Sequence, residues 1–309
     1  MGYFVLKRLA WMLLTLWIVF TITFALSLSV PGGPYSSERK LPPEIEENFK
    51  ARYNLDAPLH EQYFDQLLPI ISRLDLGLSQ RLLDYSVNEV IAQGFPVSGS
   101  LGIFALVFAL TLGTSAGVVS AIRRNTAYDF SLMILATIGI AVPNFVLASL
   151  AIIFFVFGIQ LLPAAGWGSL RQLILPALCL GAPFAAYIAR LTRTGMMEVL
   201  SQDYIRTAYA KGLTERRVVV RHALRGAILP VVSYLGPATA GILTGSLVLE
   251  RIFVLPGMGS HFVEAALQRD LTLAMGMVLV YTLLLFVMNT LVDISYAVID
   301  PRVKLDSKK

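Results

Sequence analysis

Long runs without a single Asp, Glu, Lys or Arg constrain this chain more than any other feature. Residues 95–122 carry no charge, and a second uncharged run extends from Phe130 to Leu170. About 20 consecutive apolar residues are enough to cross the hydrocarbon core of a bilayer as a helix. Since lipid offers the backbone no hydrogen bonds, a lone spanning segment must be helical. The sequence therefore predicts an all-α integral membrane protein.

Six segments qualify as spans. They are residues 9–30, 95–122, 130–158, 173–189, 227–249 and 271–292. The first follows Lys7 and Arg8, as in a signal peptide, but it exceeds the roughly 7–15 apolar residues of such a leader, so we expect a retained helix. The uncharged run that starts at Phe130 is too long for one span. We therefore expect residues 162–168 to form an interfacial loop or a re-entrant piece.

The distribution of Lys and Arg predicts the orientation. With the N-terminus in the cytoplasm, basic residues gather on the inner side, at Lys7, Arg8, Arg123 and Arg124, throughout residues 190–225, and in the C-terminal tail. The short outer loops hold only Arg171, Arg251 and Arg269. Cytoplasmic loops of membrane proteins carry the excess of positive charge. The expected topology is six helices with both termini in the cytoplasm.

Two polar segments lie outside these spans. Residues 31–94 are expected on the outer face as a small helical cap, with Leu41-Pro42-Pro43-Glu44 as a helix start. An excess of acidic over basic residues suggests that this loop helps to receive an extracytoplasmic partner protein, although a solvated cap without a partner fits equally.

The second polar segment, residues 190–225, is expected on the cytoplasmic face. Residues 198–211 read as one helix, Gly212 as its stop, and Thr214 as the cap of a second helix. In that second helix Arg217, Arg221 and Arg225 share one side. The adjacent apolar face holds Val219, Val220, Ala223, Leu224 and Ala227. Such a basic amphipathic helix suits either an anionic lipid surface or a cytoplasmic protein partner.

Residues 203–230 resemble the cytoplasmic "EAA" loop of type I ATP-binding-cassette importer permeases. That motif reads Glu-Ala-Ala, three residues, Gly, and later Ile-x-Leu-Pro. The matching positions here are Arg206, Thr207, Ala208, Gly212 and residues 227–230 (Ala-Ile-Leu-Pro). Arg206 replaces the usual Glu, Ala227 replaces Ile, and the gap from Gly212 to Pro230 is longer. These departures resemble the peptide-permease branch, with its Arg-Thr-Ala-x-Ala-Lys-Gly form.

The resemblance covers nearly the whole chain. The residues that carry it outside the loop are Pro31-Gly-Gly-Pro34, residues 38–44, Tyr53-Asn-Leu55, residues 241–245, Glu250, Leu255-Pro-Gly-Met-Gly259, Asn289 and residues 296–302. In this order they resemble the B-type membrane subunit of bacterial oligopeptide and dipeptide permeases. The resemblance implies three regions: residues 1–94 as first helix plus extracytoplasmic loop, 95–299 as the permease core, and 300–309 as a cytoplasmic tail.

The same resemblance implies a multi-pass protein of a bacterial plasma (inner) membrane, together with its partners and contact residues. We expect a second homologous permease subunit, two cytoplasmic ATPases, an extracytoplasmic peptide-binding protein and the lipid bilayer. The coupling helix would dock on an ATPase through Arg206, Thr207, Ala208, Lys211, Gly212 and Leu213. Asn144, Gly241, Gly245 and Asn289 are candidates for the translocation path. The Gly113–Gly117 and Gly241–Gly245 pairs, and the Pro143-Asn144 kink, also suit plain packing between helices.

Other chemistries find little support in the sequence. No Gly-x-x-x-x-Gly-Lys-Ser/Thr loop is present, so ATP and Mg are expected on partner subunits, with no cofactor in this chain. His60, His222 and His261 lie in unrelated segments, and the lone Cys179 lies in an apolar run, so neither a catalytic nor a metal site is expected. The net charge of +5 sits at the ends of apolar segments, which argues against nucleic acid.

Two alternatives to a peptide importer remain. One is a permease of the same branch for another solute, such as nickel, glutathione or a peptide-like antibiotic. The other is an ion-coupled secondary carrier. Such carriers place ionisable residues near the bilayer midplane, and no predicted span has a charge at its centre.

Overall fold

The computed structural model describes residues 2–29, 47, 51–54, 56–82 and 84–299. These residues are almost entirely helical, and their only β pairing is an isolated bridge between Leu78 and Ser86. The chain forms two compact units. One combines Met1–Val97 with Pro256–Phe286, and the other combines Ser98–Leu255 with Val287–Lys309.

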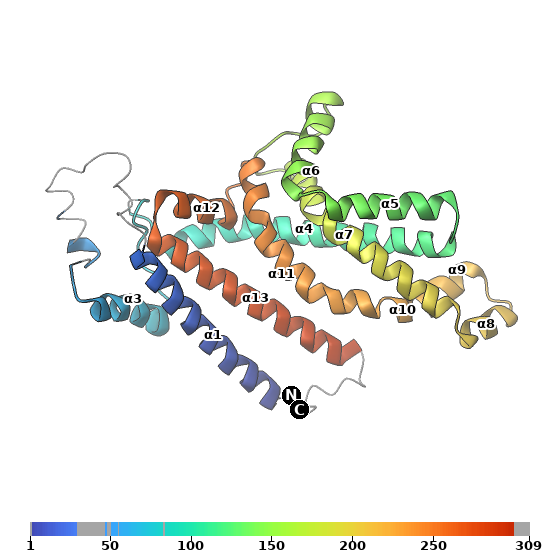
Figure 1. The fold of residues 1–309 in the computed structure, drawn as a ribbon, viewed down its shortest axis with the longest axis horizontal. Helices are drawn as coiled ribbons and strands as arrows, with labels where there is room; N and C mark the ends of the chain where they lie inside the picture. Colours follow the sequence, from blue (N-terminus) through green and yellow to red (C-terminus); the bar gives the residue numbers. More distant parts are fainter. Residues whose placement is uncertain (1, 30–46, 48–50, 55, 83, 300–309) are drawn as a thin grey trace. The chain divides into compact units, whose positions relative to one another are not determined.

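The first unit contains the beginning and a late part of the chain. Its helices are α1 (Gly2–Ser29), α3 (Leu59–Arg73), α12 (Met258–Gln268), the start of α4 (Val87–Ile122) and most of α13 (Leu271–Ile299) (Figure 1). Phe20 and Phe24 of α1 are buried with Met275 and Leu279 of α13. The Tyr63 ring of α3 packs edge-on against both phenylalanine rings, with 5.3 Å between centroids. The polar outer segment therefore does include a helix, which packs on α1.

Asp270 organises the start of α13. Its carboxylate accepts hydrogen bonds from the Ser79 hydroxyl and from the backbone N–H groups of Gln80, Arg81 and Leu273. The side chain is 1% exposed. A buried carboxylate with several N–H donors is well compensated for the loss of water. Asp270 thus caps α13 and ties the loop before α4 to that helix.

The second unit is built around α7 (Leu170–Leu200), which packs against α5 (Ala127–Ala141), α6 (Asn144–Ala151), α10 (Leu224–Ala227) and α11 (Leu229–Ile252) (Figure 1). Its buried positions include Cys179, as expected from the sequence. Helix α4 approaches α7 through small residues. A Cβ at Gly113 would lie 2.6 Å from the Ala185 carbonyl oxygen, and one at Gly117 would lie 2.5 Å from the Thr192 Cβ. The Gly113–Gly117 pair therefore serves packing within the chain.

The predicted spans are recovered, with one break. Four helices are long and apolar enough to cross a membrane, in the ranges Leu6–Ser29, Val87–Ile122, Leu170–Leu200 and Leu271–Leu291. Two bent helix pairs raise the number to six if each pair forms one span. The second pair, Glu215–Ala227 with Leu229–Thr239, bends by 54°. This agrees with six predicted segments in an all-α fold.

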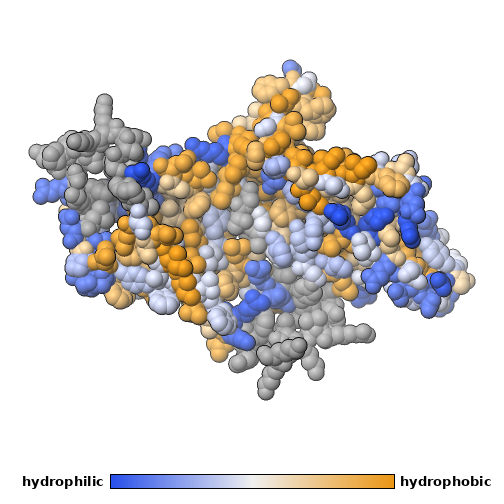
Figure 2. Space-filling view, in the orientation of Figure 1, coloured by the Kyte–Doolittle hydropathy of each residue, from blue (hydrophilic) through white to orange (hydrophobic). Residues whose placement is uncertain are grey.

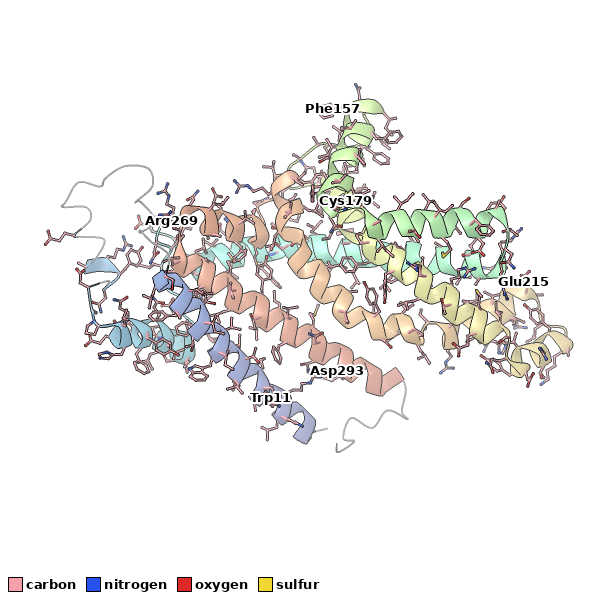
Figure 3. The ribbon with its side chains drawn as sticks, viewed as in Figure 1. Trp11, Phe157, Cys179, Glu215, Arg269 and Asp293 are labelled. Carbon is pink, nitrogen blue, oxygen red and sulfur yellow. The ribbon has the colours of Figure 1, made fainter. Side chains whose placement is uncertain are left out.

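Residues 130–158, predicted as one span with a kink at Pro143-Asn144, form two helices that meet at a sharp break. Helix α5 ends at Ala141, and α6 continues into the π-helix η1 (Ile152–Gly158) at an angle of 113°. Pro143 has no N–H to donate, and it disfavours the helical region for the preceding residue. Val142 is accordingly extended, with φ −83° and ψ 123°. Phe157, 70% exposed, lies near the outer end of the arm that α6 and η1 form (Figure 3).

The second span also begins earlier than predicted, since α4 starts at Val87 rather than near Phe95. The reason is a reciprocal cap. The Glu89 carboxylate accepts from the Ser86 N–H at 2.8 Å, and the Ser86 hydroxyl accepts from the Glu89 N–H at 3.2 Å. This capping box satisfies two backbone donors at a helix start. The Ser86-x-x-Glu89 pattern is visible in the sequence and marks this earlier helix start.

Several predictions fall outside the described residues. They are the helix start at Leu41-Pro42-Pro43-Glu44, the Pro31–Pro34 motif and the tail 300–309. Within the second unit, hydrophobic side chains cover α5 and α6, whereas hydrophilic ones gather around α8 and α9, whose bounds follow below (Figure 2).

Candidate functional site: the 201–228 segment

The 201–228 segment links α7 to α11 and consists of short helices. Helix α8 (Asp203–Ala210) is followed by a turn at Lys211–Thr214, then by α9 (Glu215–Arg217), the π-helix η2 (Val218–Ala223) and α10 (Leu224–Ala227) (Figure 1). The expected single helix over residues 198–211 is therefore wrong. Helix α7 ends at Leu200, and Gln202 is extended with ψ 149° before Asp203 opens α8. An acidic residue in a first turn is favourable, and Asp203 is the signal that could have placed this break.

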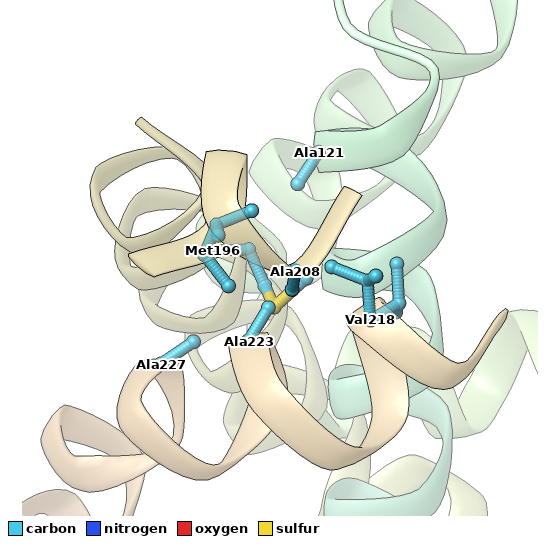
Figure 4. Packing of buried hydrophobic residues seen from close by; sticks show 8 residues of the cluster. Ala121, Met196, Ala208, Val218, Ala223 and Ala227 are labelled. Carbon is cyan, nitrogen blue, oxygen red and sulfur yellow. The ribbon is translucent and has the colours of Figure 1, made fainter. Parts of the chain in front are cut away.

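A buried apolar base holds the segment in place. Met196 of α7 and Ala121 of α4 meet Ile205 and Ala208 of α8, together with residues of the second helical stretch (Figure 4). The full set of buried members is Ala121, Met196, Ile205, Ala208, Val218, Val219, Ala223 and Ala227. Leu213 packs against them from the turn. Burial of apolar surface contributes about 25 cal/mol per Å², so this base fixes α8 on the ends of α4 and α7.

Gly212 makes the turn possible. Its φ is +77°, in the left-handed region that glycine adopts without strain. Its N–H donates to the Tyr209 carbonyl at 2.9 Å, and the Leu213 N–H donates to the Ala208 carbonyl at 3.3 Å. A Cβ placed at Gly212 would meet nothing within 4 Å. The glycine is therefore needed for its backbone conformation and not for close packing, and the predicted helix stop is confirmed.

The six predicted coupling residues all lie in the 201–228 segment, but they divide into an exposed group and a buried group. Arg206, Thr207 and Lys211 are exposed, as is Gly212. Ala208 is 6% exposed and belongs to the buried base, where Leu213 joins it at its edge. Arg206 also lies 3.6 Å from the Asp203 carboxylate, and both side chains are largely exposed, so this pair contributes little stability. The segment thus presents polar side chains outward on an apolar support.

The predicted basic helix after Thr214 is confirmed only in part. Arg217, Arg221 and Arg225 are all exposed. Thr214 precedes the helix in extended conformation, but its side chain makes no capping hydrogen bond. Val220, expected on the buried face, is 59% exposed. The π-helical turn of η2 widens the spacing beyond 3.6 residues, and this shifts Val220 off the apolar face.

A buried ion pair joins α5 to α7 beside this segment, and sequence reasoning missed it. The Arg193 guanidinium donates twice to Asp129, Nε to Oδ1 at 2.7 Å and Nη2 to Oδ2 at 2.8 Å. The Asp129 carboxylate also accepts from the Ser120 hydroxyl and from the Asn125 N–H. Asp129 is 3% exposed. Because its partners come from α4, α7 and the α4–α5 turn, no local pattern marks the pair.

The four candidate path residues all belong to the second unit, on α6, α11 and α13. Asn144 is the first residue of α6 and half-buried, while Asn289 of α13 is exposed. Gly241 of α11 faces the Phe184 ring, where a Cβ would lie 2.9 Å from Cζ. Gly245 lies in the same helix, one turn further on. Their role remains a prediction.

The described residues contain no group of three or more His, Cys, Asp or Glu side chains placed to hold a metal ion. His261 of α12 is half-buried, and this burial lowers its pKa, while the nearby Glu264 opposes the shift.

Comparison with known proteins agrees with this architecture. Residues 90–305 match the family model described as binding-protein-dependent transport system inner membrane component. The chain is 45% identical over 308 residues to a dipeptide transport system permease protein of Bacillus subtilis (strain 168), and each chain is covered completely. It is 45% identical to an oligopeptide transport system permease protein of Escherichia coli (strain K12), covering 97% of this chain and 99% of that one.

A dipeptide transport system permease protein of Lactococcus lactis is 40% identical over 98% of this chain and 99% of its own length. The family model covers well over half of the sequence, and the relatives are similar from end to end. This chain therefore belongs to the family of inner membrane components of binding-protein-dependent transport systems and is a multi-pass membrane permease.

Proposed function

We propose that this chain is the B-type permease subunit of an ATP-driven peptide importer. Its relatives over the full length are named as permeases for dipeptides and for oligopeptides. The chain would pair with a second homologous permease, two cytoplasmic ATPases and an extracytoplasmic peptide-binding protein. ATP and Mg would bind to the ATPases, and this chain would itself be neither an enzyme nor a cofactor carrier.

The proposed regions and orientation follow from the same assignment. Residues 1–94 supply the first helix and the outer segment, residues 95–299 the permease core, and residues 300–309 a cytoplasmic tail. Both termini and the 201–228 segment would face the cytoplasm, where the Lys and Arg residues concentrate. The outer segment would receive the peptide-binding protein.

The observation that carries the coupling proposal is the division of residues in the 201–228 segment. Arg206, Thr207 and Lys211 point outward, while Ala208 and Leu213 anchor the same short element to the ends of α4 and α7. A partner that binds the exposed side can move α4 and α7, because the closely packed apolar residues beneath α8 transmit a displacement and do not deform. Closure of the ATPases would thereby bias the bundle between two packings and give alternating access.

Cross-linking in the assembled transporter tests this proposal. With Cys179 replaced by alanine, a cysteine at Lys211 should cross-link to the ATPase chain in membranes that contain the whole complex. A cysteine at Tyr128, which is 66% exposed at the start of α5 and predicted on the same side of the membrane, is the matched control. Equal cross-linking at both positions, or none at Lys211, contradicts the docking site. Absence of ATP-dependent uptake of labelled di- and tripeptides into vesicles, with binding protein present, contradicts the peptide assignment.

A further inference from the structure

The C-terminal half of α7 carries a stripe of exposed polar side chains. No side chain of α7 between Leu175 and Ala186 is exposed, so this part of the helix is enclosed by its neighbours. From Tyr187 onward an exposed stripe appears, at spacings of three and four residues that place its members on one helical face. This open stripe consists of Tyr187, Arg190, Thr194 and Glu198.

The exposed face of α5 provides a comparison within the same unit. Its exposed members at similar spacing include Phe130, Ile134 and Ile138, which are 63%, 58% and 49% exposed. These side chains are suited to lipid. A phenol hydroxyl or a guanidinium is costly in hydrocarbon without a partner, and ionisable residues in spanning helices generally face a bundle interior or a water-filled cavity. Asp129 of α5 pairs with Arg193 of α7, and Gly139 of α5 lies beside Ala186, so the two exposed faces occupy the same level of the unit. At that level α5 turns apolar side chains outward, whereas α7 turns polar ones outward.

The ring of Tyr187 on α7 packs against the ring of Tyr234 on α11. Their ring centroids are 4.3 Å apart, and the ring planes make an angle of 35°. Tyr187 is 43% exposed and Tyr234 is half-buried. Within the described residues neither hydroxyl has a hydrogen-bond partner, so both remain available to a polar solute. The pair offers apolar ring surface with a polar hydroxyl on each ring.

Arg190 lies three residues beyond Tyr187 on the same stripe. It is exposed and makes no ion pair within the described part of the chain. A guanidinium presents a planar set of donors that matches a carboxylate in two-point contact. Every unmodified peptide ends in a carboxylate, whatever its side chains. An aromatic surface beside an arginine can therefore contact a peptide without selecting a particular sequence, which suits a path that must pass many different peptides.

We propose that Tyr187, Tyr234 and Arg190 form a peptide-contact surface in the translocation path, with Arg190 facing the terminal carboxylate. This proposal rests on the proposed function and adds the residues that meet the cargo. Its residues differ from the sequence-based candidates. One of those candidates, Gly241 of α11, faces Phe184 of α7.

Accessibility to water is the first test, and it does not depend on the identity of the cargo. In the complete transporter, with Cys179 replaced by alanine, Tyr187→Cys should react with a charged, membrane-impermeant thiosulfonate applied to broken membranes, in at least one nucleotide state. Ile138→Cys on α5 is the matched control and should stay unreactive in every state. If Tyr187→Cys is as unreactive as Ile138→Cys, the stripe is covered by lipid or by the partner permease, and the proposal is wrong.

Peptide chemistry is the second test. Vesicles with the complete transporter and binding protein are supplied with trialanine or with trialanine amide, which lacks the terminal carboxylate. Arg190→Gln should reduce uptake of trialanine about fivefold or more relative to the amide, since a charge-assisted contact is of the order of 1 kcal/mol or more. Arg190→Lys, which keeps the charge, should restore part of the difference.

An equal effect of Arg190→Gln on both peptides contradicts the carboxylate contact. If the unsubstituted transporter carries neither peptide but hydrolyses ATP in response to its binding protein, the peptide assignment fails, whereas the labelling result still reports whether the stripe lines an aqueous path. The two failures are thus distinguishable.

Discussion

Arg193 of α7 and Asp129 of α5, 64 positions apart in the chain, form a two-point ion pair with N–O distances of 2.7 and 2.8 Å. The pair lies seven residues before the end of α7, directly ahead of the 201–228 segment. It fastens the α4–α5 turn to the helix that carries α8. Any displacement of α8 that moves α7 will therefore carry this turn with it.

We predict that Arg193→Met destabilises the protein by about 3–5 kcal/mol, because it leaves the Asp129 carboxylate buried without its counter-ion. The double variant Asp129→Asn/Arg193→Met should recover a large part of that loss. Thermal unfolding of the detergent-solubilised complex measures both. Arg190→Met, which removes an exposed arginine of the same helix, should change stability by no more than about 0.5 kcal/mol. Additive losses in the double variant would show that the two residues act independently.

Gly212 should tolerate asparagine but not valine. A β-branched residue in the left-handed region costs about 1–2 kcal/mol, whereas asparagine adopts it more readily. Because a Cβ meets no neighbour here, the difference reports backbone strain alone. Gly212→Val should assemble poorly with the ATPases or hydrolyse ATP without transport, and Gly212→Asn should stay close to the unsubstituted protein. Copurification of the ATPases and the ratio of peptide carried to ATP hydrolysed provide the measurement. A normal ratio of peptide carried to ATP hydrolysed in Gly212→Val would show that coupling does not require the left-handed turn.

Two glycines of α4 should respond oppositely to alanine. A Cβ at Gly117 would lie 2.5 Å from the Thr192 Cβ and 2.6 Å from the Ala189 carbonyl oxygen, so Gly117→Ala forces α4 away from α7 at a cost of about 1–3 kcal/mol. At Gly99 the Cβ meets nothing within 4 Å, and alanine there should be neutral or stabilise by up to about 1 kcal/mol. The difference in unfolding temperature between the variants checks this. A Gly117→Ala protein as stable as Gly99→Ala would mean that the two helices are not in close contact.

The orientation is testable with two cysteines in a protein whose Cys179 is replaced by alanine. A cysteine at Glu47, which is exposed, should react with an impermeant maleimide in intact cells. A cysteine at Glu215, exposed at the start of α9, should react only after the membrane is opened. Native Cys179 is buried, so the background reaction is low even before its replacement. Labelling of both positions from the same side would overturn the six-span topology.

The sequence by itself determined the parts of this protein that depend on local chemistry. A charge-free run must be helical in lipid wherever it packs, so the existence of the spans was predictable. The helix ends were less so, since α4 begins at Val87 and α7 continues to Leu200. Gly212 was recognisable as a helix stop because its conformational freedom is a property of the residue. The Ser86-x-x-Glu89 cap was also readable, although the apolar run beginning at Phe95 hid it.

Only the tertiary structure decided which distant residues meet. Pro143 predicts a break but not an angle of 113°, since the bend depends on how α5 and α6 each pack on α7. Asp129 and Arg193 read as interfacial charges until the fold brings them together in a buried pair. Likewise Tyr187 becomes distinctive only when its neighbours on α7 are enclosed and Tyr234 stands beside it. Burial and pairing are properties of the packed chain, because both depend on atoms that lie far apart in sequence.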